Sequence, residues 1–222
     1  MKILISLSLL ILVSCSLKSS REIKTDLSAI DRLIEGNKRY YNSHQVHPHQ
    51  SKDRLKEISS GQHPFAVVVS CSDSRVPPEI IFDQGLGDLF VIRTAGNVIG
   101  DYELASIEYA VLKLNCKVII VTGHENCGAI QYFVDQPIDS LPGHLNVLIN
   151  FIRLEPNAIQ ILDDDHDKNY RVVIHNVIFG VHLLKESSIL RQKFENKELE
   201  IYGGVYHMAT GKVQIIEDEV KK

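Results

Sequence analysis

The sequence lacks a glycine-rich phosphate loop and has no excess of positive charge. Neither the G-x-x-x-x-G-K-[ST] pattern nor the G-x-G-x-x-G pattern occurs, so nothing in it indicates a nucleotide-phosphate site. Lysine and arginine number 24 against 28 acidic residues, and the net charge of −4 gives no electrostatic footprint for nucleic acid. With 222 residues, 44% of them hydrophobic, the chain has the composition of one globular domain with a substantial core.

The apolar run at the beginning of the chain, Ile3 to Val13, is too short to cross a bilayer. It has the size of the h-region of a signal peptide and is followed by small residues. The sequence LVSC, Leu12 to Cys15, resembles the lipobox of bacterial lipoprotein signals, in which the cysteine is lipidated. We therefore expect a signal peptide over 1–14, lipidation of Cys15, a tether over 15–24, and a membrane-anchored lipoprotein exported to the periplasm or cell envelope. A plain secretory signal and an uncleaved anchor are the alternatives.

Cysteine is scarce, and its number limits what the thiols can do. The four cysteines are Cys15, Cys71, Cys116 and Cys127. If Cys15 carries lipid, three are left, and an odd number excludes a complete disulfide framework. No C-x-x-C redox pair is present. Ligation of a metal ion by two thiolates, with Cys116 as a buried spectator, fits these numbers.

Strand-like and helix-like segments alternate between residues 65 and 123. Apolar runs of strand length cover 65–70, 88–96 and 117–123, and the segment 102–115 has apolar residues at helical spacing. Strands without internal alternation, separated by helices, predict a parallel sheet covered on both faces. Such sheets bind their ligands beyond the carboxyl ends of the strands. We therefore expect an α/β fold with a central, mostly parallel β-sheet flanked by helices.

The segment before this region predicts a helical arm. Apolar residues at helical spacing indicate a helix within 25–42, and Ser28 with Asp31 is a capping signal. A short helix is expected over 52–60. The segment 42–50 between them reads as a loop, and it carries three histidines, His44, His47 and His49. Scattered histidines on an exposed loop are commoner than a metal site, so we expect no metal there.

The last third of the chain is harder to assign. A helix is expected from about His144, after a Pro-Gly turn, and the charged run 163–169 reads as a solvated loop. The stretch 170–188 is ambiguous, because its β-branched content favours a strand and its length favours a helix. A turn at Thr210–Gly211 predicts a terminal strand or hairpin. Neither an internal repeat nor a linker long enough to divide the chain occurs.

Two thiols and an imidazole stand where two of the predicted strands end. Cys71 follows the strand 65–70. His124 and Cys127 follow the strand 117–123. If these strands are neighbours in a parallel sheet, the three side chains converge at one edge. Two thiolates and one imidazole suit tetrahedral zinc and leave a fourth position open for water. The alternatives are cysteines and a histidine packed in the core, or a Cys71–Cys127 disulfide.

Asp73 and Arg75 lie two and four residues after Cys71, an arrangement that core packing does not need. A carboxylate near a metal-bound hydroxide can accept its proton in a hydrogen bond and orient the oxygen. An arginine paired with that carboxylate keeps it ionised and fixes its rotamer. Without Arg75, Asp73 could swing in and take the fourth position on zinc. The alternative is an ordinary salt bridge in a loop.

Together, CSDSR (71–75) and GHENCG (123–128) resemble the paired zinc motifs of the β-class carbonic anhydrases. The resemblance extends from about Leu27 to Gly211 and includes IEGNKRY, RTAGN and GGVYHMATGKV. It implies a β-carbonic anhydrase domain over 25–222 that catalyses the reversible hydration of carbon dioxide to bicarbonate and a proton. It also implies a helix over 172–185, and a homodimer or homotetramer with the substrate pocket at the subunit interface.

The same resemblance assigns the site residues. It implies one Zn²⁺ per subunit, held by Cys71, His124 and Cys127, with Asp73 and Arg75 as the catalytic pair beside it. It places the substrate pocket at four residues, Gln62, Phe90, Tyr109 and Gly128.

The resemblance also predicts the subtype. Bicarbonate-regulated members typically carry a tryptophan three residues before the first ligand cysteine. Here that residue is Val68, and the chain has no tryptophan. Gln62, Phe90 and Tyr109 match the plant-like members with an open zinc site, so we expect the open, unregulated type.

The expected mechanism follows from zinc chemistry, since zinc lowers the pKa of a bound water from 15.7 to about 7. Two thiolates donate more charge than imidazoles would, which predicts a somewhat higher value here. The resulting hydroxide attacks carbon dioxide in the pocket beside Gln62, and the sequence does not single out a proton shuttle.

Other functions remain open at this point. Hydrolysis of carbonyl sulfide or carbon disulfide could use the same site. A non-catalytic, zinc-stabilised lipoprotein and a redox protein with a Cys71–Cys127 disulfide are alternatives of different classes.

Overall fold

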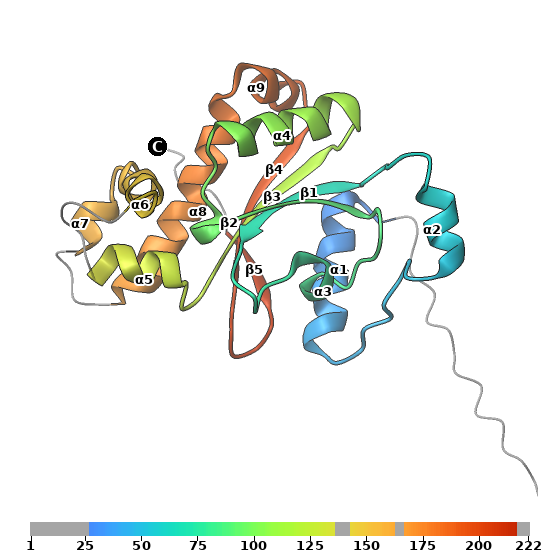
Figure 1. Ribbon diagram of the computed structural model, residues 1–222, viewed down its shortest axis with the longest axis horizontal. Coiled ribbons are helices and arrows are strands. Elements are labelled where there is room, and N and C mark those ends of the chain that lie inside the picture. Colours follow the sequence, from blue (N-terminus) through green and yellow to red (C-terminus); the bar gives the residue numbers. More distant parts are fainter. Residues whose placement is uncertain (1–26, 136–142, 163–166, 217–222) are drawn as a thin grey trace, which may run out of the picture.

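A β-sheet runs through the centre of the molecule, and helices cover both of its faces (Figure 1). The computed structural model describes residues 27–135, 143–162 and 167–216. The strands of this part are β1 (Ala66–Cys71), β2 (Leu89–Thr94), β3 (Val118–His124), β4 (Glu200–Tyr206) and β5 (Val213–Ile216). The helices are α1 (Ala29–Tyr41), α2 (Lys52–Ile58), α3 (Pro78–Ile81), α4 (Asp101–Lys113), α5 (Gly128–Asp135), α6 (Leu145–Arg153), α7 (Ala158–Leu162), α8 (Lys168–Glu186) and α9 (Ser188–Glu195), with a 3₁₀ turn, η1 (Ala95–Asn97), after β2.

The strand order within the described part is β2-β1-β3-β4-β5. The pairs β1–β2, β1–β3 and β3–β4 are parallel, and β5 returns antiparallel beside β4. The predicted mostly parallel sheet is therefore confirmed, and so is the terminal hairpin. Because β1 lies beside β3, the carboxyl ends of the two strands that precede the predicted ligands open on the same edge.

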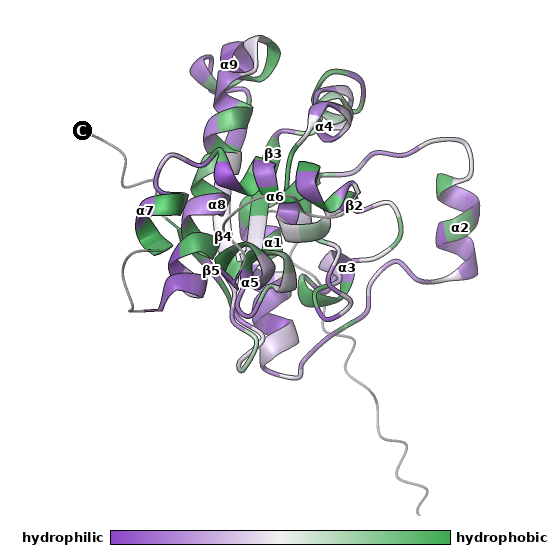
Figure 2. Ribbon diagram, turned by 60° about the vertical axis from the view of Figure 1, so that its left-hand side comes forward, coloured by the Kyte–Doolittle hydropathy of each residue, from purple (hydrophilic) through white to green (hydrophobic). Residues whose placement is uncertain are grey.

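Alternate residues of the central strands supply two separate cores. Val67 and Val69 of β1 face a cluster that includes buried residues of α4, α8 and α9. Val68 faces the opposite cluster, which includes Leu33 of α1 and Phe82 after α3. Figure 2 shows the hydrophobic strands inside, whereas α2 at the periphery is largely hydrophilic. Burial on both faces explains why the strands β1 and β3 read as continuous apolar runs.

The N-terminal helix α1 begins and docks through polar contacts. Ser28 is its N-cap, and the Ser28 hydroxyl accepts a hydrogen bond from the Asp31 backbone N–H, which confirms the predicted cap. Asn37 is buried and donates to the carbonyls of Ile81 and Gly211, at 2.9 Å each. The Asn37 carbonyl oxygen also accepts from the Val213 N–H at 2.8 Å. This one side chain therefore ties α1 to α3 and to the terminal hairpin.

The ambiguous stretch forms the long helix α8, as the resemblance implied. Its buried residues follow a spacing of three and four, which is the helical period: Val172, Val173, Asn176, Val177, Gly180, Val181 and Leu184. The loop predicted over 163–169 is wrong at its end, because Lys168 and Asn169 already belong to α8, and residues 163–166 lie outside the described part. Helices α3, α5, α7 and α9 were not predicted. Among the helices described, none has both the length and the apolar content that crossing a membrane requires.

Candidate metal centre

The three predicted ligand side chains meet at the carboxyl edge of the sheet. Cys71 is the last residue of β1, His124 is the last residue of β3, and Cys127 immediately precedes α5. All three are buried, and their ligand atoms lie within 4.8 Å of one another. The sulfur atoms of Cys71 and Cys127 are 3.9 Å apart, well beyond the roughly 2 Å of a disulfide bond. The predicted convergence is confirmed, and the three cysteines of the described part are free thiols.

The imidazole of His124 is oriented for a metal ion. Its Nδ1 donates to the carbonyl oxygen of Glu125 at 2.9 Å, so the proton belongs on Nδ1 and the Nε2 lone pair is available. Nε2 is buried and has no hydrogen-bond partner among the described residues. A buried polar atom without a partner is costly unless something binds it. An imidazole whose second nitrogen bonds a carbonyl is also the usual arrangement of a metal-bound histidine, so the residues fit zinc.

Of the two thiols, that of Cys71 readily loses its proton. The hydrogen bond from the Cys127 thiol lowers the pKa of Cys71 to about 4, against the opposing effect of burial and with further help from the backbone N–H groups of Asp73 and Gly96. The same shared proton, together with burial, raises the pKa of Cys127. The Cys127 sulfur in turn accepts from backbone N–H groups at the start of α5. Two soft thiolates and one imidazole form the donor set that zinc prefers.

The carboxylate of Asp73 is gripped on both oxygens by Arg75. Arg75 donates to it from Nε at 2.9 Å and from Nη2 at 2.7 Å, and its backbone N–H adds a third bond at 2.9 Å. This guanidinium holds the pKa of the Asp73 carboxyl well below its usual range. The nearer Asp73 oxygen lies 3.8 Å from His124 Nε2. Asp73 is therefore ionised, has a fixed rotamer and stands beside the ligand cluster.

Arg93, on β2, supports this loop and was not predicted as a site residue. Its Nε donates to the carbonyl oxygen of Cys71 at 3.0 Å, and its Nη2 donates to that of Asp73 at 2.6 Å. One guanidinium thus holds the backbone on both sides of Ser72. The motif RTAGN contained the signal, but sequence alone did not say which carbonyls Arg93 would meet.

Three of the predicted pocket residues lie at the opposite end of the sheet. Phe90 pairs with Val67, whereas Cys71 pairs with Thr94, so Phe90 is four residues, or about 13 Å, from the carboxyl edge. The rings of Phe90 and Tyr109 lie 6.4 Å apart, and Gln62 precedes the amino end of β1. Within one chain these residues do not line the metal centre. Gly128 does lie there, directly after Cys127, and its Cα faces open space.

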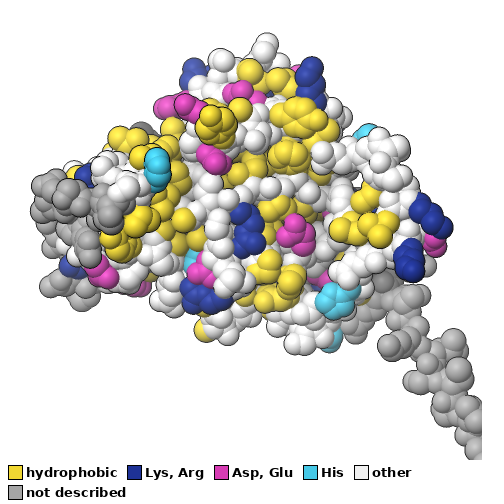
Figure 3. All heavy atoms as spheres, viewed as in Figure 1, with side chains coloured by type: hydrophobic (Ala, Val, Ile, Leu, Met, Phe, Trp, Pro, Cys, Tyr) yellow, Lys and Arg dark blue, Asp and Glu magenta, His cyan; other side chains and the backbone are white. Residues whose placement is uncertain are grey.

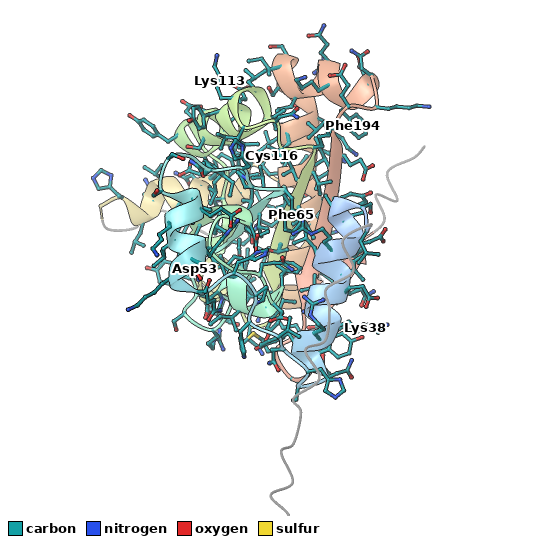
Figure 4. The ribbon with its side chains drawn as sticks, turned by 90° about the vertical axis from the view of Figure 1, so that its right-hand side faces the viewer. Lys38, Asp53, Phe65, Lys113, Cys116 and Phe194 are labelled. Atoms are coloured by element: carbon teal, nitrogen blue, oxygen red, sulfur yellow. The ribbon has the colours of Figure 1, made fainter. Side chains whose placement is uncertain are left out.

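His49 and Cys116 have local hydrogen-bond partners. His49 Nδ1 contacts the carboxylate of Asp88 at 2.7 Å, and the three loop histidines form no ligand cluster in the part of the chain that the structure describes. Cys116 is buried, and its thiol donates to the carbonyl oxygen of Pro64 at 3.3 Å. In the view of Figure 4, Cys116 and the half-buried Phe65 lie near the middle of the molecule, whereas Lys113 and Phe194 lie nearer its edge. The predicted burial of the Cys116 thiol is confirmed.

Comparison with known proteins identifies a single family. The family described as "Carbonic anhydrase" matches residues 66–213. The chain is 37% identical over 203 residues to "Carbonic anhydrase 2" of Mycobacterium tuberculosis (strain CDC 1551 / Oshkosh), covering 87% of this chain and 94% of the relative. It is 32% identical over 199 residues to "Carbonic anhydrase" of Synechococcus elongatus, which covers 82% of this chain and 70% of that relative.

Solved structures give the same result. The fold is similar to the β-carbonic anhydrase CcaA, with a TM-score of 0.68 and 29% identity over 88% of this chain and 98% of that one. It is equally similar to the Coccomyxa β-carbonic anhydrase in complex with acetazolamide, with a TM-score of 0.68, 28% identity and 87% of each chain covered.

Proposed function

This chain belongs to the β-carbonic anhydrase family, and it catalyses the zinc-dependent, reversible hydration of carbon dioxide; we propose that Cys71, His124 and Cys127 hold the zinc ion in an open site. The observation that carries the ligand assignment is the buried cluster of two thiols and an unpartnered imidazole nitrogen at one sheet edge. When bound, zinc supplies the Lewis acidity that makes water a nucleophile near neutral pH.

The protein side chains orient the reactants. Asp73, ionised and held on both oxygens by Arg75, accepts a hydrogen bond from the attacking water and directs its lone pair towards carbon dioxide. Arg75 Nη2 also donates to the carbonyl oxygen of Asn126 at 3.0 Å, which ties the pair to the loop that carries Cys127. With both oxygens engaged, Asp73 is held back from the fourth ligand position. This grip, together with Val68 at the position of the regulatory tryptophan, supports the open, unregulated subtype.

Stopped-flow hydration of carbon dioxide by the wild type and by Asp73→Asn, with zinc content measured in parallel, tests the function. The wild type should bind one zinc per chain and be active, and Asp73→Asn should keep zinc but lose about 10- to 100-fold in kcat. A zinc-replete wild type without activity from about pH 6 to 9 would contradict the assignment. Extended X-ray absorption at the zinc edge checks the open site, because a carboxylate as fourth ligand would contradict it.

A second copy of the chain should complete the substrate pocket. Exposed apolar side chains gather over α4, beside the free edge of β2, as Figure 3 shows, and they include Tyr102, Tyr109 and Leu112. If two copies meet there about a two-fold axis, the amino end of one sheet faces the carboxyl edge of the other. Phe90 and Tyr109 of one chain would then line the metal centre of its partner. The site of one chain therefore supports a homodimer, the smaller of the two predicted assemblies.

We further propose that the protein is exported and anchored by a lipid on Cys15, the signal peptide being residues 1–14. The support is the LVSC sequence after the apolar run; Cys15 and the predicted tether lie outside the described residues. Metabolic labelling with palmitate in a bacterial host should label the wild type and not Cys15→Ala. Label that persists in the variant would refute lipidation at this cysteine.

A further inference from the structure

The turn that follows β2 contacts the Cys71 sulfur directly. The backbone N–H of Gly96 donates to Cys71 Sγ at 3.3 Å, and the N–H of Asp73 donates to the same sulfur at 3.4 Å. Hydrogen bonds of this kind stabilise the thiolate form, orient its lone pairs and tune how strongly it binds a metal ion. The position of the Gly96 peptide therefore matters for the first ligand.

This turn has a conformation that few sequences hold unaided. Gly96 has φ +66° and ψ +23°, and the next residue, Asn97, has φ +48°. Two successive residues in the left-handed region are unfavourable and persist only when the surroundings hold them. A Cβ on Gly96 would also lie only 3.2 Å from the Cβ of Ala129, so glycine is needed here. Because a glycine backbone can adopt many conformations, a contact from elsewhere in the molecule must restrain the Gly96 peptide.

The restraint comes from Asn176, 80 residues further along the chain. Its Nδ2 donates to the carbonyl oxygen of Gly96 at 2.8 Å, in a buried position. Asn176 is the polar member of an otherwise apolar buried face of α8, between Val173 and Val177. A buried amide at such a position is costly unless it is hydrogen-bonded, so packing alone does not account for asparagine. Gly96 therefore accepts a hydrogen bond from the Asn176 side chain at its carbonyl oxygen and donates one to the Cys71 sulfur from its N–H.

We propose that Asn176 is a positioning residue for zinc: by fixing the Gly96 turn it keeps the Gly96 N–H on the Cys71 thiolate and so raises the affinity for the metal ion. The inference rests on the proposed ligation of zinc by Cys71. Asn176 acts through Gly96 and does not itself reach the ligand cluster. Losing such an outer partner of a metal ligand typically weakens metal binding about 10- to 100-fold.

The test compares Asn176→Leu, which keeps the branched shape of the side chain but removes the donor, with Val181→Ala, which removes packing from the same buried face of α8. Zinc dissociation constants come from competition with a chromophoric chelator. The thiolate-to-cobalt absorption of the Co²⁺-substituted proteins reports the bonding at sulfur. Melting temperatures of the metal-free proteins show how much stability each change removes. Asn176→Ser is measured in parallel, because a smaller residue is tolerated where leucine overpacks.

Both Asn176 variants should bind zinc about 10- to 100-fold more weakly than the wild type and shift the cobalt absorption. Val181→Ala should leave the zinc affinity and the cobalt absorption unchanged, even if its melting temperature falls as much as that of the Asn176 variants. Asn176 variants with wild-type zinc affinity and an unshifted cobalt band would overturn the inference and leave the proposed function intact. A wild type without any thiolate-to-cobalt band would overturn the ligand assignment together with the inference.

Discussion

The two ends of the sheet differ in their side chains: those at the carboxyl end are polar and hydrogen-bonded within the chain, and those at the amino end include exposed apolar ones. At the carboxyl end, polar side chains are bound within the chain: Arg75 grips Asp73, Arg93 holds two carbonyls, and His124 Nδ1 has its acceptor. Towards the amino end, on the later turns of α4, apolar side chains such as Tyr109 and Leu112 are exposed, at 49% and 48%. The carboxyl end thus holds a ligand cluster whose three side chains all come from one chain. The amino end, with α4, exposes the apolar surface on which the proposed dimer places a second copy.

The largest effect should come from removing a ligand at the carboxyl end. Cys127→Ser replaces a soft thiolate by a poor ligand, so zinc content should fall from one per chain towards zero. Activity should fall about 1,000-fold or more, because water is no longer activated. Elemental analysis and stopped-flow hydration measure the two quantities. Cys116→Val is the control and should keep both; a Cys127→Ser protein with full zinc would remove Cys127 from the ligand set.

Arg75→Ala should have the next largest effect, because it frees Asp73 without touching a ligand. We expect a loss of about 10- to 100-fold in kcat at neutral pH. The pKa of Asp73, held low by Arg75, should rise towards the ordinary 3.9. In the wild type, the stability from ionised Asp73 is present above that ordinary value and is lost only as the pH falls through the lower folded pKa. The variant should therefore lose activity at a higher pH on the acid side.

Arg75→Lys sharpens this test. It keeps the charge but not the two-pronged grip, so it should fall between the wild type and Arg75→Ala in kcat. Equal kcat values for Arg75→Lys and Arg75→Ala would show that Arg75 contributes to catalysis through its two-point geometry and not through its charge. An acid limb that does not move in either variant would contradict the role given to Asp73.

The proposed dimer is tested by placing a charge on its exposed apolar surface. Leu112→Asp places a charge on the apolar face of α4, so the protein should elute as a monomer in size-exclusion chromatography. Its kcat/KM should fall about tenfold, equivalent to 1.4 kcal/mol, although its zinc content stays the same. Ile159→Asp, an equally exposed apolar position on α7, is the matched control and should change neither. A fully active Leu112→Asp monomer would show that one chain suffices.

The smallest effect is expected at Cys116, a buried thiol beside the amino ends of β1 and β3 that belongs neither to the ligand cluster nor to the exposed apolar surface. Burial raises its pKa to about 11, above the ordinary 8.5 of a thiol. Because the pKa is higher in the folded than in the unfolded chain, the protonated Cys116 thiol contributes to stability. This contribution is complete below about pH 8.5 and is lost as the pH rises towards 11. Cys116→Val should change stability by less than about 1.5 kcal/mol at neutral pH and make unfolding less sensitive to alkaline pH. Urea unfolding at several pH values measures both; unchanged alkaline sensitivity would contradict the assignment.

Sequence patterns predicted the carboxyl end better than the rest. Cys71 and His124 stand at the ends of apolar runs, and strand ends are visible locally, so their convergence needed only the assumption that the strands are neighbours. The role of Arg93 was missed, because its acceptors are carbonyls 20 and 22 residues away, which no side-chain pattern marks. Asn176 lay in a stretch whose secondary structure was ambiguous, and its bond to Gly96 spans 80 residues.

The sequence by itself determined the kind of fold, the ligand types and the pairing of Asp73 with Arg75, since each depends on hydrophobic runs or on residues close together in the chain. Only the tertiary structure decided that Phe90 lies about 13 Å from the edge where Cys71 lies. It alone showed that the Gly96 turn is held from α8. The reason is physical: the register of neighbouring strands and the packing of a distant helix are set by the whole core at once.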